Sequence, residues 1–424
     1  MQILAFYPYV PFPLDRGAYY RGFHLLRELA RAHDVDLLAL SEDGQGTCEA
    51  AVFQEFCRNV DFVRFRHPEW EKLLPTRLLN RLPATVAHWT LPEVGASVER
   101  LIRTRRYDSI HIFDSILAQY VLRQDPALPV VIDRTRVDLQ YQLMERRWLQ
   151  TRLRRRILDF ENLMKLWSYE RRIASRTKLQ IVCGPDDAQF LRRWVSRSLR
   201  LAVIPNGVDT EYFTPAGTRT EAPSMEPTIL FCGAMDYNPN IDALRWYFGN
   251  MHGKLVENVP GLRVWLVGKE PGEEVRKYGR LANVMVTGSV PDVRPYYRRA
   301  WLQIVPLRIG GGTRLKIVES MAIGTPVIST TIGAQGLGLT HGQDILLADS
   351  ASDFVRTTLE ALRNPELRQC VREAGLATVR ARLAWPTLGK ELTEVYARSF
   401  GLPPNSPHRD DSIPVATGGC RALV

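Results

Sequence analysis

The residues best equipped for chemistry stand together between positions 306 and 328, where a glycine run separates an apolar segment from a helical one. Gly311 and Gly312 follow an expected strand, and Arg314 and Lys316 open the helix after them. Unpaired backbone N–H groups and the helix dipole favour an anion at such a helix start, and glycine lets the backbone approach it closely. Cations placed there oppose the dipole unless an anion neutralises them. The pattern therefore predicts a diphosphate site, with a plain glycine turn flanked by solvated basic residues as the alternative.

A parallel α/β sheet has to position that turn, and the hydrophobic pattern of the second half predicts one. The expected strands there are residues 228–233, 263–268, 284–287, 302–306 and 326–329. Helices are expected from about residue 241 and over residues 314–323. The first half shows the same alternation of strands and helices. Its expected strands are residues 3–7, 35–40, 109–113, 130–133 and 180–183. The predicted fold class is α/β, with two doubly wound units in one chain.

Breaks in this pattern predict the domain limits. A stretch rich in Pro, Thr and Glu separates the two sheets and is typical of a linker. A helical region breaks at Trp385-Pro386, and the Pro-rich end of the chain is expected to be disordered. The expected parts are an N-terminal domain over 1–205, a linker over 206–227, a second domain over 228–384, a helix over 385–400 that crosses back to the first domain, and a tail over 401–424.

Composition narrows the class of protein. With 424 residues, of which 45% are hydrophobic and 24% charged, the chain can form two cores and is neither disordered nor fibrous. It contains no uninterrupted apolar run of about 18 residues, and its first residues lack the basic start of a signal peptide, so we expect a cytoplasmic protein. The six cysteines are scattered without a C-x-x-C pair, which argues against a disulfide framework and a cysteine-built zinc site.

Most of the basic charge is concentrated in one segment. The net charge is +10, and residues 145–178 hold eleven Lys and Arg against four Asp and Glu, so a general nucleic-acid-binding role is not predicted. Apolar residues recur every three or four positions within this segment, as in an amphipathic helix. They are Leu149, Leu153, Ile157, Phe160, Met164 and Trp167. A basic helix over about 146–178 can lie on the anionic inner face of a plasma membrane, and a core-facing stripe is the alternative.

Several motifs, in order, resemble the retaining GT-B glycosyltransferases of family 4. They are Gly17 after the first strand, Ile204-Pro205-Asn206-Gly207-Val208-Asp209 at the domain junction, Phe231 to Asn240, and Pro306 to Ile328. The run from Gly311 to Lys316 and the end from Trp385 to Tyr396 look closest to bacterial sugar transferases associated with exopolysaccharide clusters. The resemblance implies two Rossmann-like domains facing a cleft. It also implies transfer of a hexosyl group from a nucleoside-diphosphate sugar as co-substrate, with retention at the anomeric carbon and without a metal or other cofactor.

The resemblance assigns roles to residues of the second domain. Glu319 matches the second acid of the family's E-x7-E motif, which grips the ribose hydroxyls. The first acid falls at Gly311, so the usual basis for inferring the donor sugar is missing. Many relatives clamp the diphosphate with an Arg and a Lys that residues 235–240 lack, so Arg314 and Lys316 are the expected catalytic substitutes. The expected donor-binding residues are Gly17, Gly311, Gly312, Thr313, Arg314, Lys316 and Glu319.

In the first domain, polar residues after the strands are candidates for contact with the donor sugar or the acceptor. Open α/β sheets bind ligands at the carboxyl ends of their strands, where His111, Asp114 and Arg134 are expected. Relatives often carry a histidine where this chain has Phe113, which leaves Asp114 as the catalytic candidate and His111 as a polar contact. Arg16, in the loop after the first strand, is expected to meet an anionic acceptor.

The sequence thus predicts a glycosyltransferase of polysaccharide synthesis that acts on a glycan or lipid-linked acceptor. A nucleotide-sugar epimerase on the same fold and a non-catalytic nucleotide-sugar-binding protein are the alternatives. A dinucleotide-dependent dehydrogenase is disfavoured because no G-x-G-x-x-G follows the first strand. Asp34-Val35-Asp36 spells a D-x-D metal pattern, but it begins an expected buried strand, so no metal site is predicted.

Overall fold

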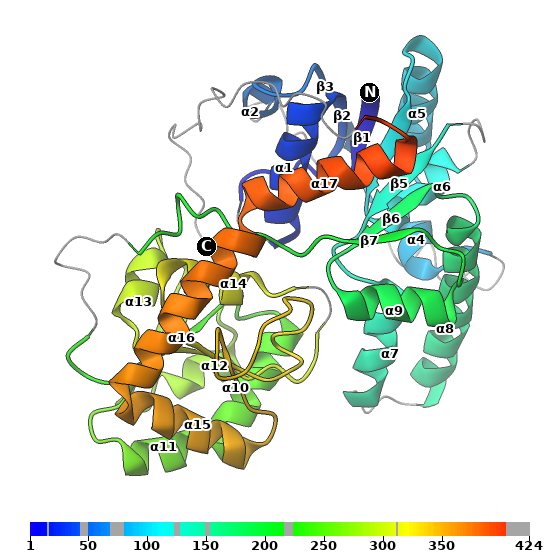
Figure 1. Ribbon diagram of the computed structural model, residues 1–424. Coiled ribbons are helices and arrows are strands. Elements are labelled where there is room, and N and C mark those ends of the chain that lie inside the picture. Colours follow the sequence, from blue (N-terminus) through cyan, green and yellow to red (C-terminus); the bar gives the residue numbers. More distant parts are fainter. Residues whose placement is uncertain are drawn as a thin grey trace. The chain divides into compact units, whose positions relative to one another are not determined.

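The chain divides into two compact units between Ile204 and Pro205 (Figure 1). We call residues 1–204 unit 1, together with the last helix from Gly389 onward, and residues 205–388 unit 2. The computed structural model describes residues 1–14, 17–42, 50–67, 80–122, 128–148, 153–215, 224–310 and 313–403. The predicted tail lies largely outside these residues. No helix in the described part of the chain has both the length and the apolar character needed to cross a lipid bilayer.

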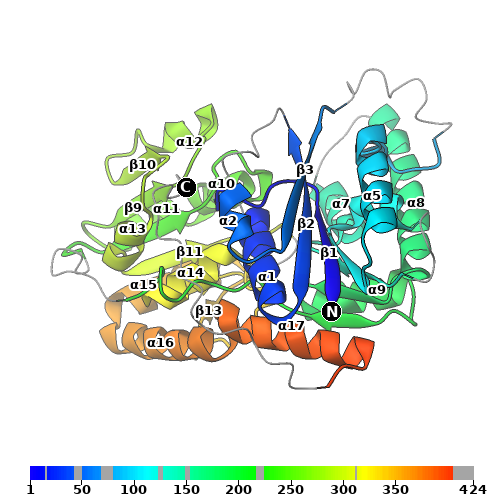
Figure 2. The same cartoon turned by 90° about the horizontal axis from the view of Figure 1, so that it is seen from above.

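Unit 1 is built on a seven-stranded parallel sheet with the order β3-β2-β1-β4-β5-β6-β7. Its strands are β1 (Gln2–Tyr7), β2 (Asp34–Glu42), β3 (Asn59–Phe65), β4 (Ser109–Phe113), β5 (Val130–Asp133), β6 (Leu179–Val182) and β7 (Leu201–Val203). The central strands are mostly apolar and buried along almost their whole length, because helices cover both faces of the sheet. Figure 2 shows α1 and α5 on opposite faces of strands β1 and β2.

The helices of unit 1 follow the strands in alternation. They are α1 (Gly17–Ala32), α2 (Ala50–Gln54), α4 (Ala84–His88), α5 (Pro92–Thr104), the 3-10 turn η1 (Ser115–Leu117), α6 (Ala118–Val121), α7 (Asp138–Trp148), α8 (Leu153–Ala174) and α9 (Pro185–Trp194). Apolar side chains of α5, α6 and α8 pack on one face of the sheet, with Val98 and Ile173 buried against Ile112 of β4 and its neighbours.

Unit 2 contains a six-stranded parallel sheet with the order β10-β9-β8-β11-β12-β13. Its strands are β8 (Thr228–Cys232), β9 (Arg263–Val267), β10 (Val284–Gly288), β11 (Leu302–Val305), β12 (Val327–Ser329) and β13 (Leu346–Leu347). The helices are α10 (Asn238–Asn250), α11 (His252–Asn258), α12 (Glu273–Tyr278), α13 (Arg294–Arg299), α14 (Leu315–Ile323), α15 (Ala351–Arg363), α16 (Pro365–Thr378), the π-helical turn η3 (Val379–Leu383) and α17 (Trp385–Phe400), whose second part belongs to unit 1. The predicted pair of doubly wound parallel sheets is confirmed.

In both sheets the strand order reverses at the first strand of the unit. β1 lies between β2 and β4, and β8 lies between β9 and β11. The loops that leave two such neighbouring strands run to opposite faces of the sheet, so the carboxyl ends of β1 and β4, and those of β8 and β11, are the places where α/β folds bind ligands. Ligand-binding residues are therefore expected at the carboxyl ends of these two pairs of strands.

The buried face of α8 differs from the predicted apolar stripe. Leu166, Tyr169 and Ile173 are buried, whereas Phe160 and Met164 are 59% and 45% exposed. The interpretation of the stripe as core-facing is therefore wrong for Phe160 and Met164, because the helix turns a different row of side chains toward the sheet. The predicted basic helix is also two helices, α7 and α8, and Leu149 lies outside the described residues.

Candidate functional site

The loops after β8 and β11 form the candidate site of unit 2. The two strands pair in parallel, so their carboxyl ends lie next to each other. Gly233 follows β8 with a φ of 149°, a conformation that side-chain-bearing residues rarely adopt. A Cβ atom at this glycine would lie 2.7 Å from Lys316 Nζ. The glycine therefore leaves room for an ammonium group at the end of β8.

Helix α14 carries the predicted basic and acidic side chains. It begins at Leu315, one residue later than predicted, because Arg314 keeps an extended backbone with φ −93° and ψ 107°. It ends at Gly324, whose φ of 89° is the left-handed conformation that glycine favours at helix ends. Lys316 and Glu319 are three residues apart on this helix and therefore lie on the same side of it.

Lys316 reaches across to the end of β8. Its Nζ atom donates a hydrogen bond of 2.9 Å to Asn240 Oδ1 and lies 4.4 Å from the centre of the Phe231 ring. Burial lowers the pKa of Lys316 to about 8, and the nearby Arg314 guanidinium acts in the same direction. Lys316 of α14 thus supplies a positive charge at the turn over residues 235–240, which contains no Lys or Arg.

Glu319 lies one helical turn further along. The buried Tyr297 hydroxyl donates a hydrogen bond of 3.0 Å to Glu319 Oε2. Burial raises the pKa of Glu319 to about 7, against the opposite effects of this hydrogen bond and of the Lys316 charge. The site therefore holds a cation and a carboxyl group whose pKa values are both displaced toward neutrality, as is common at functional sites.

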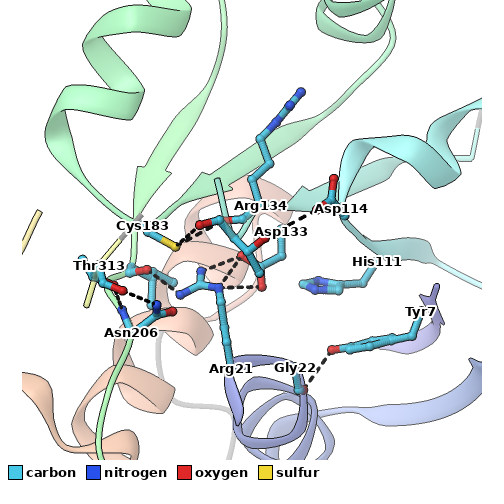
Figure 3. A network of polar contacts seen from close by, with 12 residues as sticks. Tyr7, Arg21, Gly22, His111, Asp114, Asp133, Arg134, Cys183, Asn206 and Thr313 are labelled. Atoms are coloured by element: carbon cyan, nitrogen blue, oxygen red, sulfur yellow. Dashed lines mark hydrogen bonds and ion pairs between the residues drawn. The ribbon is translucent and has the colours of Figure 1, made fainter. Parts of the chain in front are cut away.

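Two hydrogen bonds hold Thr313, which follows the glycines between β11 and α14. The Asn206 backbone N–H donates to Thr313 Oγ1 at 2.8 Å, and the Asn206 side-chain amide donates to the Thr313 carbonyl oxygen at 3.0 Å (Figure 3). The Arg314 guanidinium lies against Gly310, where a Cβ atom would come within 2.5 Å of its Nη2 atom. The two other residues predicted for this turn are Gly311 and Gly312. Both lie outside the described part of the chain.

In unit 1, Asp114 ends β4 in an unusual conformation. Its φ is 80°, which is costly for a residue with a side chain and is found mostly at functional sites. Its backbone N–H donates to the Asp133 carbonyl oxygen at 2.7 Å, and its Oδ1 accepts from the Ser115 N–H at 2.6 Å. Burial, and next the charge of Asp138, raise the pKa of Asp114 to about 6. The carboxyl group is thus held at the place where unit 1 is expected to bind a ligand.

A buried ion pair that the sequence did not indicate lies beside it. The side chains of Arg21 on α1 and Asp133 at the end of β5 are both fully buried and approach within 2.5 Å (Figure 3). Arg21 also donates to the Ile204 carbonyl oxygen at 2.9 Å. The pair fixes the end of β5 to the first helix and to the last residue of the unit's main segment.

Two residues that the sequence predicts to contact the sugar or the acceptor are buried in unit 1. Arg134 is fully buried, and its guanidinium donates two hydrogen bonds to Glu170 and one to Gln180. His111 is also buried, and its Nδ1 atom lies 2.6 Å from the Tyr396 hydroxyl of α17. Both side chains have hydrogen-bond partners inside the unit, and their contact with a sugar or an acceptor stays a prediction.

The remaining predicted residues are placed as follows. Gly17 is the first residue of α1, directly after the loop that leaves β1, and Arg16 lies outside the described residues. Asp36 of the D-x-D pattern accepts hydrogen bonds from Arg58, Asn59 and Tyr107. Within the described residues, no group of three or more His, Cys, Asp or Glu side chains is arranged to hold a metal ion.

Comparison with known families accounts for both units. Residues 20–207 match the family described as glycosyl transferase 4-like domain, and residues 226–364 match glycosyl transferases group 1. The chain belongs to this GT4 family of glycosyltransferases, and the two sheets are the two domains of a GT-B fold. The resemblance inferred from the motifs is confirmed.

Curated relatives match parts of the chain. A 231-residue stretch is 28% identical to phosphatidyl-myo-inositol mannosyltransferase of Mycobacterium tuberculosis and covers 50% of this chain and 59% of that protein. A 144-residue stretch is 25% identical to a 44.6 kDa protein in the cps region of Klebsiella pneumoniae and covers 32% of this chain and 37% of that protein. The chain thus spans between about a third and three fifths of the length of these relatives.

Solved structures match over almost the whole chain. A sucrose-phosphate synthase from Thermosynechococcus elongatus superposes with a TM-score of 0.69 at 21% identity, covering 95% of this chain and 100% of that one. The Anabaena protein HepE, in complex with UDP and glucose, superposes with a TM-score of 0.63 at 16% identity, covering 94% and 100%. At these identities the likeness establishes the fold.

Proposed function

We propose that the protein transfers a sugar from a nucleoside-diphosphate sugar to a glycan or lipid-linked acceptor, with retention of configuration at the anomeric carbon. The observation that carries this proposal is the arrangement of Lys316 and Glu319 at the adjoining ends of β8 and β11. A cation and a carboxyl group one helical turn apart suit the diphosphate and the ribose of one nucleotide. Membership of the GT4 family supports the same function.

The diphosphate is the leaving group in this proposal. When the bond between the anomeric carbon and the phosphate oxygen breaks, negative charge develops on the phosphate. Lys316, Arg314 and the backbone N–H groups at the start of α14 stabilise that charge in the transition state. Because Asn240 already holds the Lys316 ammonium, little reorientation is needed when the charge appears. An acceptor hydroxyl oxygen then bonds to the anomeric carbon on the face that the phosphate leaves, and the hydroxyl proton passes to the departing diphosphate.

Glu319 binds the ribose. Its carboxylate can accept hydrogen bonds from both hydroxyls of a vicinal diol while Tyr297 holds one of its oxygens in place. Thr313, whose hydroxyl oxygen accepts a hydrogen bond from the Asn206 N–H, is a further donor-binding residue in this proposal. Gly311 and Gly312 complete the donor site with their backbone N–H groups.

Unit 1 supplies the face that meets the sugar and the acceptor. Asp114 stands at the end of β4 in a strained conformation and is the catalytic candidate there. Gly17 lets the backbone of the first loop come close to the donor, and Arg16 meets an anionic acceptor. His111 and Arg134, which also have partners inside the unit, are the further candidates for contact with the sugar or the acceptor.

The donor and the pathway are proposed from the relatives. HepE was observed with UDP and glucose, so UDP-glucose is the first donor to test. The relative from the cps region supports a role in synthesis of a cell-surface polysaccharide or exopolysaccharide, and the mannosyltransferase supports a lipid-linked acceptor. We place the protein in the cytoplasm, where nucleotide sugars are available.

Contact with a membrane surface is part of this proposal. Among the side chains of α7 and α8 that the structure describes, the exposed apolar ones are Leu143, Leu158, Phe160 and Met164. Three of them lie in the basic segment 145–178, and Leu143 lies two residues before it. Exposed apolar residues beside basic ones suit the surface of an anionic bilayer, where a lipid-linked acceptor is presented.

Turnover assays with purified protein test the proposal. We expect release of the nucleoside diphosphate. NMR of the product should show the same anomeric configuration as that of the donor sugar. Arg314→Ala should abolish turnover without changing the melting temperature, whereas Arg356→Ala, at an exposed ion pair on α15, should not affect turnover. Full activity of the Arg314→Ala variant would show that the phosphate assignment is wrong. Conversion of the donor to an epimer, or binding without turnover, would favour the two alternative functions.

A further inference from the structure

Two side chains near the start of α10 each hold a cation from another part of unit 2. Asn240 Oδ1 accepts a hydrogen bond of 2.9 Å from Lys316 Nζ. The Asp242 carboxylate accepts hydrogen bonds of 3.0 and 2.5 Å from the Arg308 guanidinium. The two contacts therefore differ in the kind of acceptor, which is a neutral amide for the lysine and a carboxylate for the arginine.

The kind of acceptor decides which cation keeps its charge for a ligand. Arg308 and Asp242 form an ion pair, in which the carboxylate compensates the charge of the guanidinium. The Lys316 ammonium instead lies against the Asn240 amide and the ring of Phe231, 4.4 Å from the ring centre, and neither of these groups carries a charge. An amide can thus fix the position of an ammonium group without neutralising it.

The Asn240 amide is itself held in one orientation. The side chain is buried, and its Nδ2 atom donates to the Ala234 carbonyl oxygen at 2.7 Å while its Oδ1 atom accepts from Lys316. A rotated amide would direct its own N–H groups at the ammonium group. A Cβ atom at Gly233 would lie 2.7 Å from Lys316 Nζ and 3.0 Å from Asn240 Nδ2, so the glycine leaves room for both groups.

A second asparagine of α10 makes no such contact with a lysine. Asn250, the last residue of the helix, is exposed, and its side-chain amide donates to the Trp246 carbonyl oxygen at 3.0 Å. It shares the residue type and the helix with Asn240 and is therefore a matched control.

We propose that Asn240 is a positioning residue that holds the Lys316 ammonium for the diphosphate of the donor and leaves its charge uncompensated, an inference that rests on the proposed function of this site. Without the Asn240 side chain, the ammonium group has to be ordered when the ligand binds, which weakens binding. A carboxylate in the same place would pair with the lysine and compete with the phosphates. In both cases the effect is on the phosphates of the nucleotide and not on the nucleoside.

Calorimetric titration of the full chain tests this inference. UDP, GDP and ADP are titrated into wild type, and the one that binds best is compared with its nucleoside, which lacks phosphates. Asn240→Ala should weaken binding of the diphosphate about tenfold. Asn240→Asp should weaken it as much as Lys316→Met does, and neither Asn240 variant should change nucleoside binding. In a Lys316→Met background, Asn240→Ala should have no further effect. Asn250→Ala and Asn250→Asp should bind like wild type.

The pH dependence of diphosphate affinity separates positioning from a purely structural role. The charges that act on Lys316 from α14 are those of Arg314 and Glu319, and burial keeps the Cys232 thiol of β8 neutral by raising its pKa to about 12. All three groups remain in both variants. A hydrogen bond to the ammonium form favours that form, so Asn240→Ala should move the alkaline decrease in affinity to lower pH. The carboxylate introduced by Asn240→Asp should move it to higher pH.

Several results would overturn the inference. Wild-type affinity of Asn240→Ala for the diphosphate would show that the amide does not position the lysine. Equal weakening of diphosphate and nucleoside, or the same weakening in the Lys316→Met background, would show that Asn240 acts on unit 2 by another route. The comparison of Asn240→Ala with Lys316→Met decides the question even if Asn240→Asp folds poorly. Wild type that binds no nucleoside diphosphate would instead remove the proposed function, and this inference with it.

Discussion

Replacing Glu319 by glutamine is expected to stabilise the protein at alkaline pH while impairing nucleotide binding. Burial raises the pKa of Glu319 from its ordinary value of 4.5 to about 7. A raised pKa means that the folded state favours the protonated form, so the ionised carboxyl destabilises folding as the pH rises from about 4.5 to about 7. Above that range the destabilisation amounts to about 3 kcal/mol for a displacement of this size.

Glutamine removes the charge but keeps an oxygen that can accept the hydrogen bond from Tyr297. The variant should therefore unfold at the same temperature as wild type near pH 4.5 and at a higher temperature near pH 8. For a domain of this size, about 3 kcal/mol corresponds to an increase of roughly 6–12 °C. Thermal unfolding measured at several pH values, with Glu360→Gln at an exposed position of α15 as the control, gives the comparison.

The same variant should bind the nucleotide more weakly, because an amide oxygen accepts hydrogen bonds less strongly than a carboxylate. Greater stability together with weaker binding is the pattern expected of a group kept for function. A difference in melting temperature that does not change between about pH 4.5 and pH 8, or a variant less stable than wild type at pH 8, would refute the reasoning.

Three further predictions concern Tyr297, Lys316 and the exposed Phe160. Tyr297→Phe removes a hydrogen bond that lowers the pKa of Glu319, so the acidic limb of nucleotide affinity should move to higher pH in titrations across the pH range. Nucleotide affinity of wild type should be highest between about pH 7 and pH 8, because Glu319 is protonated below this range and Lys316 loses its charge above it. Lys316→Met should weaken nucleotide binding and remove the decrease in affinity at alkaline pH. Phe160→Ser should reduce co-sedimentation with vesicles rich in phosphatidylglycerol, whereas Ile332→Ser, at another exposed apolar residue, should not.

Most of the two sheets could be predicted from the sequence because their central strands are predominantly apolar segments. The strands that the sequence did not reveal lie toward the sheet edges. β3 alternates apolar residues with Asp61 and Arg64, and β7 and β13 are only three and two residues long. Such strands are defined by the neighbour they pair with and not by their own composition.

The candidate site was predictable where its residues are close in the sequence. Lys316 and Glu319 share one helix, so their spacing alone places them on one side of it. Their partners Asn240 and Tyr297 come from other helices, 76 and 22 residues away, and residue types alone give no sign of these contacts.

The internal partners of two candidates in unit 1 could not be predicted for the same reason. Arg134 and His111 follow or belong to strands at the expected edge, which suggested contact with a ligand. Arg134 is instead paired with Glu170, 36 residues further along, and His111 with Tyr396, 285 residues away. A charged or polar residue at a strand end is therefore ambiguous until its partners inside the fold are known.

The central claim is that the ends of β8 and β11 bind the nucleoside diphosphate through Glu319 and Lys316. The most direct test is a thermal-shift panel of UDP, GDP, ADP, dTDP and CMP on wild type, Glu319→Ala, Lys316→Ala and the control Glu360→Ala. We predict that one diphosphate raises the melting temperature of wild type and of the control but of neither site variant. A nucleotide that stabilises all four proteins equally would contradict the claim.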